Sequence, residues 1–237
     1  MYKTQKTYIN PELKVATLIN ENPRLLLLLE HLNMDFTIGD KNVTQLCKEN
    51  SIPIDIFIVF GNLYNGFNQE IKEIQSKDAI QVILRFLKNS HLYYKTDKYP
   101  ELIGLIRELQ DKTGNSEVKL IERFFSDYFG EVLDHLDYEE KIAFPYFLEL
   151  IEPSSQFTKS EFSVKEYRDH HSDIETKLSD LKNLLLIHIK ISDELSLRRK
   201  LFFSLLELEF DLMIHALIEE KILLPLIMKV EKSRSNG

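Results

Sequence analysis

The stretch HLDYEEKIAFP at residues 135–145 recurs 80 residues later as HALIEEKILLP at residues 215–225. The two copies match at His, at both Glu residues, and at Lys, Ile and Pro. Each copy contains His-x-x-x-Glu, and residues four apart on a helix lie on one face with adjacent side chains. Each copy can therefore point an imidazole and a carboxylate at one spot. Two such helices facing each other would provide half of a dinuclear metal site.

The composition restricts the class of protein. The chain has 237 residues, 43% of them hydrophobic, which is enough for a sizeable core in one large or two modest domains. Its longest purely apolar run, at residues 25–29, is too short to span a bilayer, and no signal peptide is evident. We therefore expect a cytoplasmic protein without a membrane partner. A net charge of −8 with scattered basic residues argues against a nucleic-acid partner. Cys47 is the only cysteine, so any metal site must use histidine and carboxylate ligands.

Helical segments dominate the predicted structure. Glycine and proline are rare, with seven of each, which favours an all-α protein. Turn-forming residues at 65–66, 112–116, 153–155 and 192–193 leave four helical segments after about residue 72. Each segment carries a stripe of mostly apolar residues in steps of three and four, with one histidine on it. The stripes run through Ile80, Leu84, Leu87, His91 and Tyr94; Ile121, Phe125, Tyr128, Val132, His135, Glu139, Ile142 and Tyr146; Tyr167, His171, Ile174, Leu178, Leu181 and Leu185; and Leu205, Leu208, Leu212, His215, Glu219, Ile222 and Leu226.

The four histidines are expected at one depth of a helical bundle. In an antiparallel pair, two residues at the same level are equidistant from the turn that joins their helices. The midpoints between successive histidine levels fall at Gly114, Ser154 and residue 194, each at or beside a predicted turn. This agreement predicts an up-down-up-down four-helix bundle. Pro100 is the one misfit, and we expect it to kink or restart its helix.

The predicted ligands are four imidazoles and two carboxylates in the bundle interior. A buried carboxylate must be neutralised, paired or metal-bound, and no Lys or Arg lies on a stripe at this depth. These ligands suit iron or manganese and would accept zinc, and two carboxylates that can bridge favour a pair of ions. His170 also fits the third stripe. However, His91 precedes His135 by 44 residues and His171 precedes His215 by the same 44 residues, and this equal spacing favours His171. The predicted set is His91, His135, Glu139, His171, His215 and Glu219.

The order of these residues resembles that of hemerythrin-like domains, over about residues 73–237. The closer likeness is to the repair-of-iron-centres family, also known as regulators of cell morphogenesis and nitric oxide signalling. That family uses one His, a His-x-x-x-Glu, another His and a second His-x-x-x-Glu, which maps onto the six predicted ligands in order. The His-x-x-x-His and late Asp ligand of oxygen-carrying hemerythrins are missing. The resemblance implies two iron ions with an oxo or hydroxo bridge, and glutamates that also bridge them.

The N-terminal third carries a second resemblance. Residues 25–64 are similar to the small helical ScdA-like domain that is often fused to this family. We therefore expect two domains, at residues 1–72 and 73–237. The Cys-Cys pair typical of that domain is absent, because Thr37 and Ile38 stand in its place. Cys47 is expected to pack as a small hydrophobic residue.

Several residues near the predicted site have competing interpretations. Glu131 and Asp211, each four residues before a ligand histidine, could accept the second imidazole N–H, although charge on the helix surface is the commoner interpretation. Tyr94, Tyr128, Phe144 and Tyr146 are expected to wall the site from solvent. His31 and His188 are expected to be incidental to it.

The resemblance implies a cytoplasmic di-iron protein of the oxidative or nitrosative stress response. It would support repair of damaged iron–sulfur clusters by delivering iron to apo or damaged iron–sulfur proteins. A second hypothesis is a sensor or scavenger that binds dioxygen, nitric oxide or peroxide and keeps its iron. A third is a helical adaptor without a functional metal. The sequence leaves open whether the protein is an enzyme, which metal it loads and whether it forms a homodimer.

Overall fold

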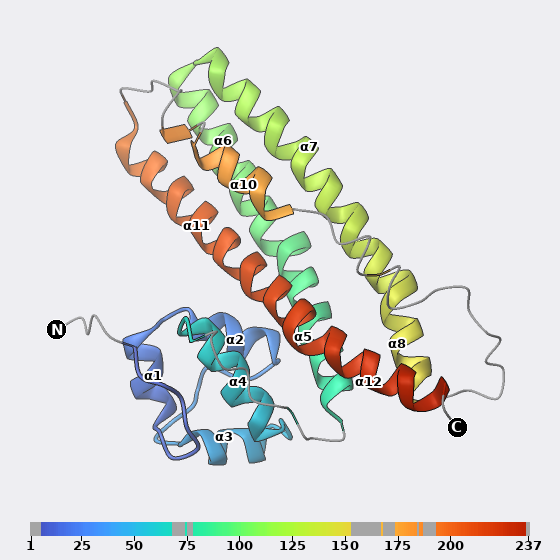
Figure 1. The fold of residues 1–237 in the computed structure, drawn as a ribbon. Coiled ribbons are helices and arrows are strands. Elements are labelled where there is room, and N and C mark those ends of the chain that lie inside the picture. Colours follow the sequence, from blue (N-terminus) through green and yellow to red (C-terminus); the bar gives the residue numbers. More distant parts are fainter. Residues whose placement is uncertain are drawn as a thin grey trace. The chain divides into compact units, whose positions relative to one another are not determined.

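The computed structural model describes residues 6–67, 74, 78–152, 167, 174–183, 185–186 and 193–235 (Figure 1). Across these residues the chain is helical, with one isolated β-bridge between Lys14 and Asn42 and no strand. The predicted all-α class is therefore confirmed. No helix in this part of the chain is long and apolar enough to cross a membrane.

The chain divides into two compact units. The first consists of Met1–Ser90, Phe147–Gln156 and Ile214–Gly237, and the second of His91–Tyr146 and Phe157–Met213. The predicted domain boundary between residues 72 and 73 lies outside the described residues and stays a prediction.

Four short helices make up the N-terminal part of the first unit: α1 (Val15–Glu21), α2 (Leu25–His31), α3 (Val43–Glu49) and α4 (Ile54–Tyr64). A buried asparagine ties the N-terminal segment to α4. The Asn62 side chain accepts a hydrogen bond from the Ile9 N–H at 2.7 Å and donates one to the Ile9 carbonyl at 3.1 Å. A Cβ atom at Gly61 would lie 2.7 Å from Cδ1 of Ile9, so only glycine permits this approach without a shift. Cys47 on α3 is buried, as predicted.

The same unit packs these short helices against the first part of α5 (Ala79–Tyr93). Phe86 makes edge-to-face contacts with Phe60 of α4, at 4.9 Å between ring centroids, and with His31 of α2, at 5.2 Å. The Asn89 side chain donates a hydrogen bond to the His31 carbonyl at 2.8 Å. The N-terminal helices and the start of α5 therefore share one core, and His31 is fully buried in it.

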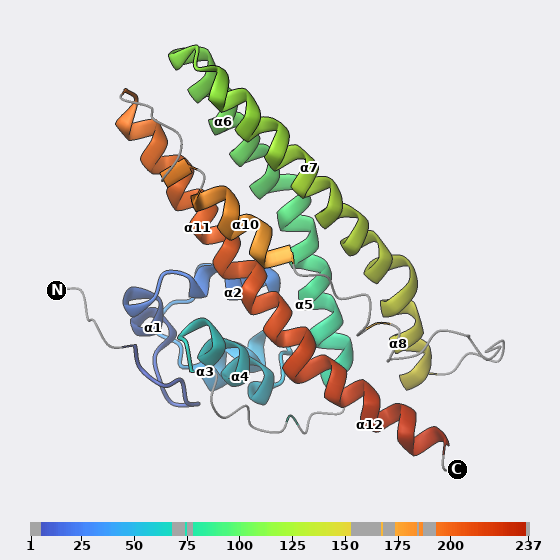
Figure 2. The same cartoon turned by 45° about the horizontal axis from the view of Figure 1, so that its top comes forward.

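The second unit contains four helical segments that lie side by side, as both views show (Figures 1 and 2). α6 (Tyr99–Thr113) is capped by Gly114, where φ is 59°, and α7 (Ser116–Tyr138) starts two residues after this glycine, so the pair is antiparallel about the predicted midpoint. Lys182 on α10 pairs with Glu209 on α11, and the Lys98 side chain donates to Ser204 of α11 at 3.4 Å. These contacts join the segments of the predicted bundle within this unit. The elements concerned are α6 (Tyr99–Thr113), α7 (Ser116–Tyr138), α10 (Ile174–Asn183) and α11 (Leu195–Ile218).

At three places in the described part of the chain, a π turn precedes a proline. The residue just before the proline donates its N–H to the carbonyl five residues back. Proline has no N–H, and its ring crowds the carbonyl four residues back, so the helix widens by one residue instead of ending. Pro100 therefore does not end its helix, which continues as α6 after the π turn. The turns are η1 (Tyr94–Lys98) before Pro100, η2 (Glu139–Ala143) before Pro145 and α8 (Phe144–Ile151), and η4 (Glu219–Leu223) before Pro225 and α12 (Leu224–Ser235).

The π turns change which side chains are buried beyond them. Ile142, predicted on the buried stripe of the second segment, is 45% exposed, whereas Ala143 and Phe147 are fully buried. Likewise, Leu226 is half-buried while its neighbour Ile227 is fully buried. One extra residue in each turn moves the following side chains by one position. The predicted stripes were therefore wrong at Ile142 and at Leu226, because they assumed an unbroken α-helix, whereas Ile222 is buried as predicted.

Candidate metal centre

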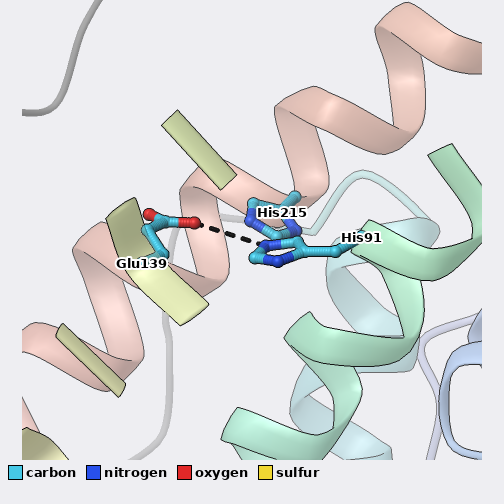
Figure 3. Close-up of side chains that lie close together, drawn as sticks. All are labelled: His91, Glu139 and His215. Carbon is cyan, nitrogen blue, oxygen red and sulfur yellow. Dashed lines mark ion pairs between the residues drawn. The ribbon is translucent and has the colours of Figure 1, made fainter. Parts of the chain in front are cut away.

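The second unit brings three predicted ligands together: His91 from the end of α5, His135 from α7 and Glu139 from the start of η2. His91 and Glu139 are fully buried, and the His135 side chain is 11% exposed. Glu139 Oε2 lies 3.3 Å from His91 Nε2, and Glu139 Oε1 lies 3.2 Å from His135 Nε2. The dashed line in Figure 3 marks the first of these two pairs. Each carboxylate oxygen therefore faces a different imidazole.

These separations fit shared metal ligation. A nitrogen and an oxygen bound to one ion at about 2.1 Å each, roughly at right angles, lie about 3 Å apart. Two groups of His and Glu side chains in the described part of the chain could hold a cation, and Glu139 belongs to both, with His91 in one and His135 in the other. The donor set of imidazoles and carboxylates, without a thiolate, suits iron.

The first unit brings His215 and Glu219 together, at the end of α11 and the start of η4. Glu219 is fully buried and His215 is 5% exposed. His215 Nε2 lies 3.2 Å from Glu219 Oε1, the same separation as that between His135 and Glu139. Both copies of His-x-x-x-Glu therefore present a nitrogen and an oxygen at a spacing suitable for one ion. His171 and its alternative His170 lie outside the described residues, and so does His188, so their roles stay predictions.

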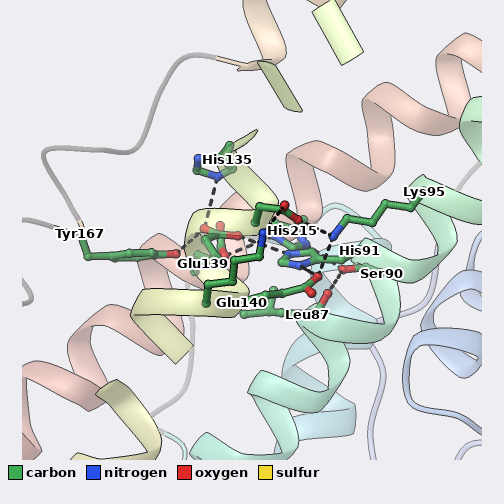
Figure 4. Close-up of polar contacts among 12 residues, drawn as sticks. Leu87, Ser90, His91, Lys95, His135, Glu139, Glu140, Tyr167 and His215 are labelled. Atoms are coloured by element: carbon green, nitrogen blue, oxygen red, sulfur yellow. Dashed lines mark hydrogen bonds and ion pairs between the residues drawn. The ribbon is translucent and has the colours of Figure 1, made fainter. Parts of the chain in front are cut away.

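The second nitrogen of His91 is held by a charged network (Figure 4). His91 Nδ1 lies 2.8 Å from Glu140 Oε1, and the Lys95 ammonium donates to that same oxygen at 3.1 Å and to Asp137 at 3.2 Å. The pKa of Glu140 is lowered to about 2, first by the hydrogen bond with His91 and then by Lys95, against the opposing effect of partial burial. The Phe144 ring stacks on the imidazole at 5.6 Å. The imidazole of His91 is thus restrained at Nδ1 by Glu140 and on its ring face by Phe144.

Other polar contacts fix the remaining side chains. His215 Nδ1 lies 2.9 Å from the Ser90 hydroxyl, which donates to the Leu87 carbonyl at 2.7 Å. The Tyr167 hydroxyl donates a hydrogen bond to Glu139 Oε1 at 2.8 Å, which restrains this carboxylate.

Among the acidic residues that precede the repeat histidines, Glu131 is exposed, whereas Asp211 is buried, at 1% exposure. Asp211 accepts a hydrogen bond from the Tyr94 hydroxyl at 2.8 Å, so the surface-charge interpretation was wrong for this residue.

Sequence reasoning missed three of these partners. Glu140 is the second Glu of the repeated EEK, so the repeat itself carried a signal for it. Tyr167 was placed on a stripe, but its hydroxyl contact with Glu139 was not foreseen. Nothing in the sequence marks Ser90.

The fold and these residues define a class: an all-α protein with a buried histidine and carboxylate cluster that could hold a cation. The family model of the hemerythrin HHE cation binding domain matches residues 98–227, and the chain belongs to this family. No curated protein matches the chain. The matched region contains both copies of the repeat, whereas His91 lies before it. The resemblances to the repair-of-iron-centres family and to its N-terminal domain stay predictions.

Proposed function

We propose that this protein is a cytoplasmic non-haem di-iron protein of the oxidative or nitrosative stress response. In this proposal it supports repair of damaged iron–sulfur clusters by delivering iron to them. The ligands would be the six residues predicted from the sequence, His91, His135, Glu139, His171, His215 and Glu219.

The arrangement of Glu139 carries the proposal for two ions. Its two oxygens face the Nε2 atoms of two different histidines at 3.2 and 3.3 Å, as a bridging carboxylate requires. The hydrogen bond from Tyr167 keeps the carboxylate in this orientation, and full burial keeps bulk water from it. A bound pair of iron ions would supply one-electron redox chemistry and open positions for a diatomic ligand. Family membership supports cation binding by this part of the chain.

Iron transfer tests this proposal directly. Protein from iron-supplemented cells is expected to carry about two irons per chain and to restore activity to an apo iron–sulfur enzyme in a stoichiometric, chelator-sensitive reaction. The Glu122→Gln variant is a control that should behave like the parent protein, because Glu122 pairs with Arg107 at 2.7 Å on the bundle surface and has no contact with the ligands above. Absence of iron from both the parent protein and Glu122→Gln would refute the proposal that the site holds iron.

Burial of the ligands supports a second candidate, a sensor or scavenger of dioxygen, nitric oxide or peroxide. His91, Glu139 and Glu219 are all fully buried, which favours slow metal release and thus retention of iron. If the loaded protein binds nitric oxide reversibly and transfers no iron to the apo enzyme, the second candidate stands and the delivery function is excluded.

A further inference from the structure

We propose that Glu140 and Ser90 are positioning residues that hold His91 and His215 in the same tautomer through hydrogen bonds of unequal strength, which makes His91 the stronger donor to a metal ion. The part concerning donor strength rests on the proposed function, because it assumes that both imidazoles bind metal. The part concerning the tautomers stands on the hydrogen bonds alone.

The tautomer of His91 follows from the partner of its Nδ1 atom. An ionised carboxylate can only accept hydrogen bonds, so the imidazole must present Nδ1–H to Glu140 Oε1, at 2.8 Å. In the neutral ring the lone pair is then on Nε2, which lies 3.3 Å from Glu139 Oε2. Lys95 donates to the same Glu140 oxygen at 3.1 Å, so a positive charge keeps the carboxylate ionised in a half-buried position.

The tautomer of His215 follows from a count of protons. A serine hydroxyl has one proton, and Ser90 gives it to the Leu87 carbonyl at 2.7 Å. The Ser90 oxygen can therefore only accept from His215, whose Nδ1 lies 2.9 Å away and must carry the hydrogen. In the neutral ring the lone pair of His215 is then on Nε2, which lies 3.2 Å from Glu219 Oε1.

The two partners differ in their effect on the ring. A hydrogen bond to a carboxylate is roughly twice as strong as one to a neutral oxygen. It also draws the Nδ1 proton outward and raises the basicity of the opposite nitrogen, as carboxylate partners of metal-bound histidines do. Ser90 is neutral and supplies no such charge. His91 should therefore donate more strongly to a bound metal ion than His215 does.

Nitrogen NMR of the metal-free protein tests the tautomers without reference to metal. With 15N-labelled histidine at pH 8, His91 and His215 should both show a protonated Nδ1. Glu140→Ala should release this preference at His91 only, and Ser90→Ala at His215 only, while Glu122→Gln should change neither. A neutral ring that carries its proton on Nε2 in the parent protein, or an unchanged His91 spectrum in Glu140→Ala, would overturn the assignment.

Cobalt titration tests the inequality. Glu140→Gln should weaken Co²⁺ binding by about 10–100-fold, as loss of an outer partner of a metal ligand typically does. Ser90→Ala should weaken Co²⁺ binding by less than about tenfold. Equal losses in the two variants would overturn the claim of unequal donors. If the parent protein bound no Co²⁺, Zn²⁺ or iron, the proposed function and the unequal donation would both fail, while the NMR result would still decide the tautomers.

Discussion

Replacing Glu139 with Gln should weaken metal binding while leaving the stability of the metal-free protein nearly unchanged. The amide has nearly the same shape and keeps an oxygen that can accept the hydrogen bond from Tyr167, now 2.8 Å from the carboxylate. We therefore expect the metal-free variant to melt within about 4 °C of the metal-free parent, which corresponds to roughly 1 kcal/mol for a chain of this size. The stabilisation that metal confers should fall sharply, because an amide is a weaker metal ligand than a carboxylate.

The size of that fall follows from the two oxygens of Glu139. An ion present at 1,000 times its dissociation constant stabilises the folded state by about 4.1 kcal/mol, and a 100-fold weaker affinity reduces this to about 1.4 kcal/mol. Because each oxygen faces a different histidine, at 3.2 and 3.3 Å, both ions should be weakened. The total loss is then about 5 kcal/mol, or roughly 10–20 °C in the metal-induced rise of the melting temperature.

Calorimetry with and without metal provides the assay, and His135→Ala is the comparison that tests bridging. His135 faces only one oxygen of Glu139, so its removal should weaken one ion and cost about half as much of the metal-induced rise. If the two variants lost equal amounts, Glu139 would not bridge two ions. If Glu139→Gln kept the full metal-induced rise, the carboxylate would not be a ligand.

Further substitutions test the core, the thiol and the fourth histidine. His31→Ala removes a fully buried side chain, so we expect the free energy of unfolding, measured with urea, to fall by about 2–5 kcal/mol while the metal content stays unchanged. A fall in metal content would contradict the purely structural role of His31. Asn62→Ala leaves two backbone groups of the N-terminal segment without their partners, at 2.7 and 3.1 Å, so stability should fall by about 2–4 kcal/mol and proteolysis before α1 should accelerate; an unchanged cleavage rate would argue against this anchor. Burial raises the pKa of Cys47 to about 12, so at pH 8, well below that pKa, only roughly one thiol in 10⁴ is ionised and labelling should require denaturation; fast labelling of native protein would show that the thiol is accessible. His171→Ala should lower the metal content while His170→Ala retains it, and the opposite result would move the ligand assignment to His170.

Much of the fold was predictable because it depends on local geometry. The turn at Gly114 follows from counting residues along two antiparallel helices, and the structure ends α6 there. The burial of residues beyond Glu139 was not predictable from a period of 3.6. Pro145 ends the repeat and was a visible signal, but a proline can end, bend or widen a helix. Packing on both sides of the proline decides between these outcomes, and that packing is tertiary.

At the candidate site too, the local contacts were predictable from the sequence and the long-range contacts were not. The pairing of His135 with Glu139 was predictable, since residues four apart on a helix face one way. The contact of Ser90 with His215 was not, because it spans 125 residues and depends on rotamers that no periodicity encodes.

The doubled glutamate of the repeat shows how local and tertiary structure combine at the site. Consecutive residues on a helix point about 100° apart, so Glu139 and Glu140 would normally serve different faces. Here they contact the two nitrogens of one imidazole: Glu139 lies 3.3 Å from Nε2 of His91, and Glu140 lies 2.8 Å from Nδ1. A ring inserted edge-on between adjacent side chains can meet both of them. The first glutamate is thereby placed as a metal ligand and the second as the residue that orients the neighbouring ligand. In the second copy Glu220 is exposed, so the match between the two repeated sequences does not by itself give both second glutamates the same role.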